Sequence, residues 1–207
     1  MDFEAFALPA VILVSLTALV LLANLDWRLT ILALAIQYAG VFVLVGLDWP
    51  VEMAASKLVA GWMAGAVLGM AMVSVPQNET MDTAPTSGWP DSLRFPTGRL
   101  FRLFAAALVI LAVLSLAPTV QGAIPAFELA QVRGGMILIG MGLLQLGFTA
   151  NPFRTIVGLL TLLAGFEIFY ASVERSVLVA GLLAAVNLGL ALIGSYLVIA
   201  PSMEEIE

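Results

Sequence analysis

Few side chains in this sequence could do chemistry, and those that could lie inside strongly apolar segments. Glu167 lies near the middle of one such segment, residues 154–173. A carboxylate at the centre of a bilayer costs about 3 kcal/mol to insert, so we expect it to be either neutral or paired with a cation. Burial favours the neutral carboxyl and a nearby cation favours the charged one, so such a group can take up and release a proton. The alternative is a protonated carboxyl that only donates a hydrogen bond between helices.

Lys57 is the second ionisable candidate. It lies about one helical turn inside another apolar segment, residues 55–75. Its flexible stem could carry the ammonium group to the membrane surface, where the charge stays hydrated. If the side chain faces protein instead, the ammonium group could carry a proton or favour the charged form of a nearby carboxyl. The sequence leaves both alternatives open.

Amide and hydroxyl groups form the rest of the candidate site. Gln37 and Asn187 lie in the middle of apolar segments, and Tyr170 follows Glu167 by less than one turn. Inside a bilayer such groups usually join helices, and each hydrogen bond contributes about 1 kcal/mol. They could equally hold water along a proton path. We take these three residues as supporting members of a proton path around Glu167 and Lys57.

The residue types that are missing exclude much chemistry. The chain contains no Cys and no His, which excludes thiol chemistry, iron–sulfur ligation, histidine-held haem and Cys/His zinc sites. The sequence also lacks a phosphate-binding loop, a dinucleotide fingerprint and a metalloprotease motif. We therefore expect no catalytic residues, no metal and no cofactor in this chain. Whether it works within an enzyme complex stays open at this point.

The composition indicates a membrane protein. Of the 207 residues, 62% are hydrophobic and only 11% are charged, whereas a soluble domain has about half apolar and a quarter charged residues. The formal net charge of -6 argues against nucleic acid as a partner. The expected surroundings are the lipid bilayer and other membrane proteins.

Seven segments have the length that a bilayer of about 30 Å requires of a helix. They are apolar on all sides rather than alternating, which favours helices over strands. The predicted spans are residues 5–24, 29–47, 55–75, 100–118, 132–150, 154–173 and 176–200. The sequence thus predicts an all-α integral membrane protein.

Basic residues predict the orientation. Seven spans place the termini on opposite sides, and more basic residues fall on the C-terminal side (Arg28, Arg94, Arg99, Arg102 and Arg154) than on the N-terminal side (Lys57, Arg133 and Arg175). The positive-inside rule then places the C-terminus in the cytoplasm and the N-terminus outside. The acidic start of the chain does not resemble a signal peptide, so we expect a multi-pass protein of the inner (cytoplasmic) membrane.

An internal similarity divides the chain. Residues 56–72 and 176–192 are identical at nine of 17 positions, and an Ala-Asn pair precedes both the second and the sixth span. We predict two parallel three-helix repeats joined by an extra helix. The units are a first repeat over 1–75, a cytoplasmic linker over 76–98, a linking span and outer loop over 99–131, and a second repeat over 132–207.

Short motifs carry a resemblance to a known family. Trp27 and Arg28 before the second span, Gln37 inside it, and Ser56 and Lys57 at the start of the third span resemble the pattern of hydrogenase-4 component E membrane subunits. Those are seven-span proteins of similar length.

The second repeat resembles a related family, the K-type subunit of respiratory complex I. Gly165, Phe166 and Glu167 resemble the Gly-Leu-Glu run of that family, and the loop 151–154 resembles its short basic loop. In the component E pattern the glutamate stands one turn earlier, where this chain has Leu163. The K-type pattern has a further glutamate in its last span, where Asn187 is the nearest polar group here.

The resemblance implies a non-catalytic membrane-arm subunit of a complex I-like respiratory or hydrogenase complex of formate hydrogenlyase type. Its implied partners are antiporter-like membrane subunits and other membrane-arm subunits. Redox centres such as Fe–S clusters would be held by partner chains. Glu167 and Lys57 would contribute to proton or ion translocation, and Gln37, Asn187 and Tyr170 would support hydrated connections.

Three alternatives remain. The first is a C-type subunit of a multisubunit cation/proton antiporter, a family that usually has three spans. The second is a free-standing small transporter with parallel repeats, whose centre should hold several polar groups and often broken helices. The third is a purely structural subunit, in which Glu167 only packs helices.

Overall fold

The computed structural model describes residues 4–75 and 97–204, and every regular element in these residues is an α-helix. Each of the seven helices is long and apolar enough to cross a membrane. The chain is therefore a multi-pass membrane protein, with seven helices in its described residues. The helices are α1 (Glu4–Ala23), α2 (Trp27–Val45), α3 (Val51–Ser74), α4 (Thr97–Ala123), α5 (Leu129–Gly147), α6 (Pro152–Val173) and α7 (Val177–Glu204).

Local sequence signals start several of these helices. The Asp26 side chain accepts a hydrogen bond from the backbone N–H of Arg28 and caps α2. Asn151 caps α6 in the same way, and Pro152 follows it in the first turn, where no backbone N–H is needed. Glu128 and Gln131 form a reciprocal capping box at the start of α5. Such caps satisfy backbone N–H groups that the helix itself leaves unpaired.

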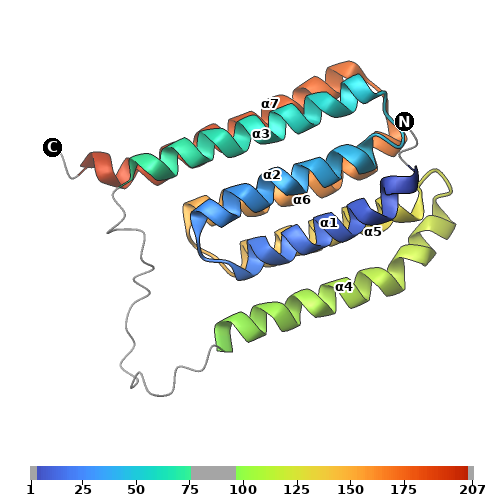
Figure 1. The fold of residues 1–207 in the computed structure, drawn as a ribbon, viewed down its shortest axis with the longest axis horizontal. Coiled ribbons are helices and arrows are strands. Elements are labelled where there is room, and N and C mark those ends of the chain that lie inside the picture. The colour runs from blue at the N-terminus through green and yellow to red at the C-terminus, as the bar shows by residue number, and fades with distance from the viewer. Residues whose placement is uncertain (1–3, 76–96, 205–207) are drawn as a thin grey trace.

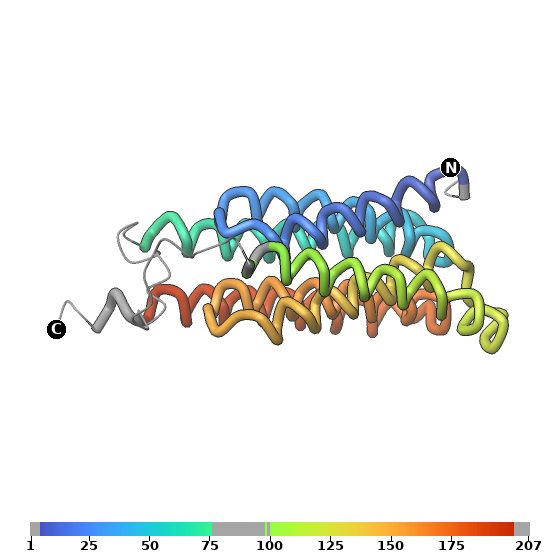
Figure 2. The backbone as a smooth tube through the Cα atoms, turned by 90° about the horizontal axis from the view of Figure 1, so that it is seen from below, coloured from blue at the N-terminus to red at the C-terminus, as the bar shows by residue number. Residues whose placement is uncertain are grey.

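The helices form two layers. One layer contains α1, α2 and α3, the other contains α5, α6 and α7, and α1 lies against α5, α2 against α6 and α3 against α7 (Figures 1 and 2). The remaining helix, α4, lies at the edge beside α1 and α5. Successive helices run in opposite directions, so α1 begins at one end of the bundle and α7 finishes at the other. We call these the N-terminal end and the C-terminal end.

The most extensive helix contact in the described residues joins α5 and α6, and glycine permits it. A Cβ atom at Gly165 would lie 2.7 Å from the backbone oxygen of Gly135, and one at Gly142 would lie 2.7 Å from the backbone nitrogen of Leu162. No side chain fits at either position. Small residues of this kind let helices in membranes approach closely and gain van der Waals contact.

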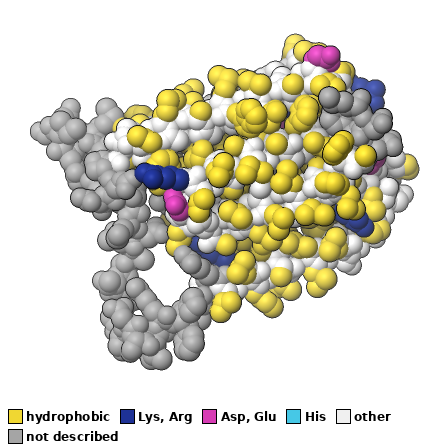
Figure 3. Space-filling view, viewed as in Figure 1, with side chains coloured by type: hydrophobic (Ala, Val, Ile, Leu, Met, Phe, Trp, Pro, Cys, Tyr) yellow, Lys and Arg dark blue, Asp and Glu magenta, His cyan; other side chains and the backbone are white. Residues whose placement is uncertain are grey.

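The outer surface has the character of a lipid-facing one. On the face shown in Figure 3, hydrophobic side chains cover most of the bundle, and charged side chains gather toward its two ends. Large apolar side chains such as Val73, Leu178 and Tyr196 are between two thirds and four fifths exposed. A soluble protein rarely shows an apolar surface this extensive.

Several predicted boundaries differ from the structure. We expected the fourth span to end at Pro118, but α4 continues through that proline to Ala123. Membrane helices tolerate an internal proline because the helix adjusts locally around the missing N–H. The fifth helix begins at Leu129, so residues 129–131 belong to it and not to the predicted outer loop. Most of the predicted linker 76–98 lies outside the described residues, and the two-repeat division stays a prediction.

Candidate functional site

Lys57 and Glu167 form an ion pair in the interior of the bundle. The Nζ atom of Lys57 lies 2.7 Å from Oε1 of Glu167, and each side chain is 1% exposed. The pair joins the two layers, since Lys57 belongs to α3 and Glu167 to α6. Lys57 therefore faces protein and does not extend to the membrane surface.

The two charges lie at matching depths. Lys57 is six residues from the start of α3 and Glu167 is six residues before the end of α6, which places each about 9 Å along its helix from the N-terminal end. A hydrocarbon core is about 30 Å thick. The pair thus lies well inside the apolar segments, where each charge stabilises the other.

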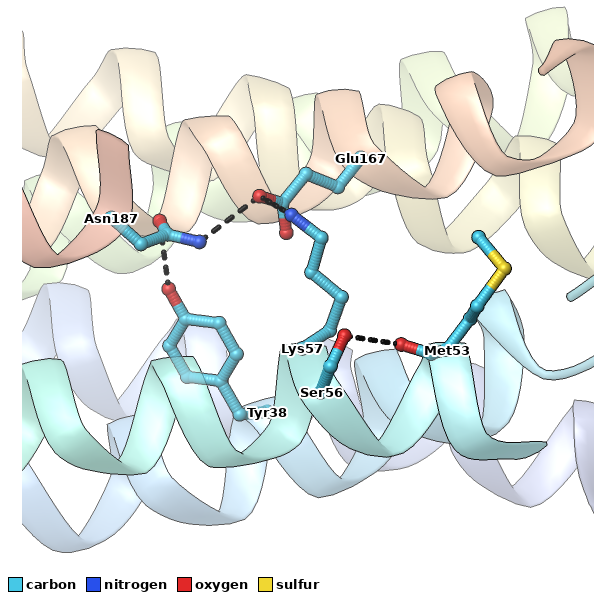
Figure 4. A network of polar contacts seen from close by, with 6 residues as sticks. All are labelled: Tyr38, Met53, Ser56, Lys57, Glu167 and Asn187. Carbon is cyan, nitrogen blue, oxygen red and sulfur yellow. Dashed lines mark hydrogen bonds and ion pairs between the residues drawn. The ribbon is translucent and has the colours of Figure 1, made fainter. Parts of the chain in front are cut away.

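Two more side chains complete what we call the ion-pair cluster: Tyr38, Lys57, Glu167 and Asn187. The Nδ2 atom of Asn187 donates to Glu167 Oε1 at 3.0 Å, and the Tyr38 hydroxyl donates to Asn187 Oδ1 at 3.4 Å (Figure 4). Four helices, α2, α3, α6 and α7, each supply one member. The Asn187 amide therefore connects the Glu167 carboxylate to the Tyr38 hydroxyl through two hydrogen bonds.

The second carboxylate oxygen of Glu167 has a different environment. Its Oε2 atom is buried and accepts no hydrogen bond from the described residues, while Oε1 accepts from both Lys57 and Asn187. Buried polar atoms almost always have partners, so this oxygen is an exception. Oε2 is thus the oxygen of this carboxyl that has no hydrogen bond within the described part of the chain.

Gln37 lies beside the cluster, one residue before Tyr38. Its Nε2 atom lies 3.3 Å from the hydroxyl oxygen of Thr161, to which it donates, and its own Oε1 atom is buried without a partner among the described residues. Thr161 precedes Glu167 by six residues on α6, about 9 Å along the helix. Gln37 and Thr161 therefore place polar atoms deeper in the bundle than Glu167. In α5, toward the C-terminal end, the Nε2 atom of Gln145 is also buried without a partner.

The structure brings together only some of the predicted site residues. Lys57 and Asn187 both contact Glu167, whereas Gln37 contacts Thr161 and is linked to the cluster only as the chain neighbour of Tyr38. Tyr170 is not part of this arrangement, because its partly exposed ring lies against Phe166, with 6.2 Å between ring centroids. Among the described residues, no hydrogen bond joins Tyr170 to the cluster.

Tyr38 and Thr161 are polar members that sequence reasoning did not single out. Tyr38 is 1% exposed, and its ring packs on Gly61, one turn beyond Lys57 on α3. The sequence signal that could have indicated Tyr38 is its position next to Gln37 in the middle of an apolar segment. Its contact with Gly61 was not readable, because it depends on which faces α2 and α3 turn toward each other.

A separate polar cluster near the N-terminal end holds the helices together. The Gln131 side chain donates to Leu44 O and to Asp48 Oδ2, and accepts from the backbone of Glu128 and from Ser172 Oγ. All its hydrogen-bonding groups are satisfied, which is the pattern of a structural link.

Two more links cross between the layers through backbone carbonyls. Near the N-terminal end, Trp49 Nε1 donates to the carbonyl oxygen of Glu174 at 2.8 Å. Near the C-terminal end, Arg154 donates to the carbonyl oxygen of Asn24. Together with Gln131, these contacts fix the two layers at both ends, so the ion-pair cluster lies in a firmly held frame.

The arrangement supports charge or proton transfer more readily than ligation. In the described part of the chain, no three acidic side chains gather where they could hold a metal ion.

No family model matches the chain, and no curated protein or solved structure is significantly similar to it. What the fold and site define is a multi-pass helical membrane protein with an ion pair buried between its two layers.

Proposed function

We propose that this chain is a non-catalytic membrane-arm subunit of a complex I-like respiratory or hydrogenase complex of formate hydrogenlyase type. In this role it contributes to proton or ion translocation coupled to redox chemistry. The observation that carries the proposal is the buried ion pair of Lys57 and Glu167. The resemblance of the motifs around these two residues to component E and K-type subunits adds to it.

A buried ion pair is a costly way to join helices. Removing two charges from water offsets much of their attraction, and apolar side chains of similar volume often stabilise a core as well or better. Ionisable groups inside membrane proteins most often lie on ion or proton pathways. The presence of Lys57 and Glu167 at this depth therefore favours a role in carrying or sensing charge.

The geometry gives that role a chemical form. With 2.7 Å between Lys57 Nζ and Glu167 Oε1, a proton can pass from the ammonium to the carboxylate, which turns two charges into a neutral amine and a neutral acid. Asn187 favours the charged carboxylate by donating to it. A change of charge in a neighbouring subunit would shift this balance, because electrostatic interactions reach far in a medium of low dielectric constant. The pair can thus respond to events elsewhere in a complex.

Polar atoms extend from the pair toward the C-terminal end. The free Oε2 of Glu167 and the free Oε1 of Gln37 are acceptors for water or for a transferred proton. We assign Gln37, Asn187 and Tyr38 to a hydrated connection that begins at Glu167. Tyr170 is a weaker member, since its ring lies outside the cluster.

The proposal includes partners and a location. Antiporter-like membrane subunits would flank this chain, and the Fe–S clusters or other redox centres would belong to partner chains. The complex would lie in the inner (cytoplasmic) membrane, with the N-terminus of this chain outside and its C-terminus in the cytoplasm. The larger number of basic residues on the C-terminal side supports that orientation.

The first test is co-purification of the tagged chain from its native membrane in mild detergent. Antiporter-like membrane chains together with redox subunits would support the proposal. Antiporter-like chains alone would favour the C-type subunit of a cation/proton antiporter instead. A stable particle of this chain alone would overturn both and favour a small transporter.

The second test separates coupling from assembly. A double variant, Lys57→Met with Glu167→Leu, removes both charges and leaves no uncompensated charge behind. We expect it to assemble while ion translocation per turnover is lost. The control is Glu174→Gln, which changes an exposed carboxylate beyond the end of the same helix. Full coupled turnover in the double variant would show that the pair only packs helices.

A further inference from the structure

A small cavity lies between the first and fifth helices, outside the ion-pair cluster. It has a volume of about 220 Å³ and is lined by Ala7, Leu8, Val11, Leu129, Ala130 and Arg133. All the lining residues except Arg133 are apolar. Because α1 and α5 both begin at the N-terminal end, the cavity lies near the depth at which a bilayer changes from headgroups to hydrocarbon.

Arg133 is the unusual member of this lining. It lies in the second turn of α5, within a segment apolar enough to span a membrane. Its Nε atom is buried and has no hydrogen-bond partner among the described residues, while the residue as a whole is partly buried. No ion pair or hydrogen bond of its side chain is present in the described part of the chain. A charged guanidinium in an apolar surrounding is costly unless an anion compensates it.

The structure points to a bound anionic phospholipid as the missing partner, and we infer that this cavity is its site. The phosphate would accept hydrogen bonds from the Arg133 guanidinium, whose planar set of N–H groups fits phosphate oxygens. Part of an acyl chain would fill the apolar cavity. A drug-sized ligand needs about 300 Å³ or more, so a cavity of 220 Å³ suits a segment of a lipid better than a whole small molecule.

A lipid fits these features better than a soluble anion or a protein carboxylate. A soluble anion would gain nothing from five apolar lining residues, whereas a lipid uses both the cation and the apolar walls. Arg175, the other arginine near this end, is exposed and lies in the connection between α6 and α7. It therefore provides a matched control that does not line this cavity.

The test measures lipid binding to the purified protein by native mass spectrometry. Protein isolated in mild detergent is stripped of lipid and titrated with phosphatidylglycerol or, for comparison, with phosphatidylcholine. We expect one tightly held phosphatidylglycerol per chain and weaker binding of phosphatidylcholine. Arg133→Gln should lower the affinity for phosphatidylglycerol about tenfold or more, which corresponds to losing a charge-assisted hydrogen bond.

A second variant tests the site independently, in case Arg133→Gln fails to fold. Ala130→Leu fills the cavity without changing charge, and it should also weaken binding, whereas Arg175→Gln should bind as the unaltered protein does. Unchanged phosphatidylglycerol binding in both Arg133→Gln and Ala130→Leu would overturn the inference. Equal affinity for the two lipids would overturn the anionic preference, and a protein carboxylate found on Arg133 in the assembled complex would exclude the lipid.

Discussion

The ring of Tyr38 occupies the space that a side chain at position 61 would need: a Cβ atom on Gly61 would lie 2.3 Å from the ring. The glycine on α3 thereby lets the tyrosine of α2 lie close enough for its hydroxyl to reach Asn187. Lys57 is one turn away on the same helix. α3 thus positions both the ion pair, through Lys57, and the tyrosine, through Gly61.

Replacing Gly61 with alanine should displace the Tyr38 ring. We expect a loss of about 1–3 kcal/mol in stability, because an overpacked core must shift side chains or backbone. The measurement is the thermal unfolding of the detergent-solubilised protein followed by tryptophan fluorescence. Gly65→Ala is the matched control, since a Cβ atom there has nothing within 4 Å, and alanine has the better helix propensity. Equal effects of the two variants would contradict the close packing of Tyr38 on Gly61.

Replacing one member of the ion pair should lower the free energy of unfolding more than replacing both members. Lys57→Met alone leaves a buried carboxylate, and Glu167→Leu alone leaves a buried ammonium, so each should cost about 3–5 kcal/mol. The double variant Lys57→Met with Glu167→Leu should recover most of that loss. A double-mutant cycle of unfolding free energies measures the interaction. Additive single effects would show that the two side chains do not depend on each other.

The number and type of helices followed from the sequence because a bilayer sets strict demands. A span must be long, apolar and internally hydrogen-bonded, and hydropathy alone reveals such segments. The helix ends were less predictable. Pro118 looked like a stop, yet α4 continues past it, since the cost of a proline in a membrane helix depends on local adjustments that the sequence does not reveal.

The candidate site was only partly readable from the sequence. Glu167 and Lys57 stood out because ionisable groups are expensive in lipid. Their pairing did not, because the two residues are 110 positions apart and belong to different layers. Asn187 joined them as a polar group on a third helix. Tyr38 was missed because its role depends on a glycine on a neighbouring helix.

The crossing of α5 and α6 should be the least tolerant glycine contact in the described bundle. Gly165→Ala places a methyl group 2.7 Å from a backbone oxygen, which no side-chain rotation can relieve. Gly140→Ala comes within 3 Å only of a methyl carbon of Val109, at 2.5 Å, and a side chain can shift more readily than backbone. We therefore expect Gly165→Ala to lower the unfolding temperature more than Gly140→Ala. Gly147→Ala, with nothing within 4 Å, should have almost no effect, and a different order would mean that the helices can separate at little cost.

The proposed orientation can be tested directly because the natural chain contains no cysteine. Single cysteines introduced at Leu25 and at Ser176 lie in connections at opposite ends of the bundle, between α1 and α2 and between α6 and α7. With the N-terminus outside, Ser176→Cys should react with a membrane-impermeant maleimide in intact cells. Leu25→Cys should react only after the membrane is opened, since a charged reagent does not cross the hydrocarbon core. The reverse pattern would place the C-terminus outside, and the excess of arginines beside α2, α4 and α6 would then face away from the cytoplasm, against the positive-inside rule.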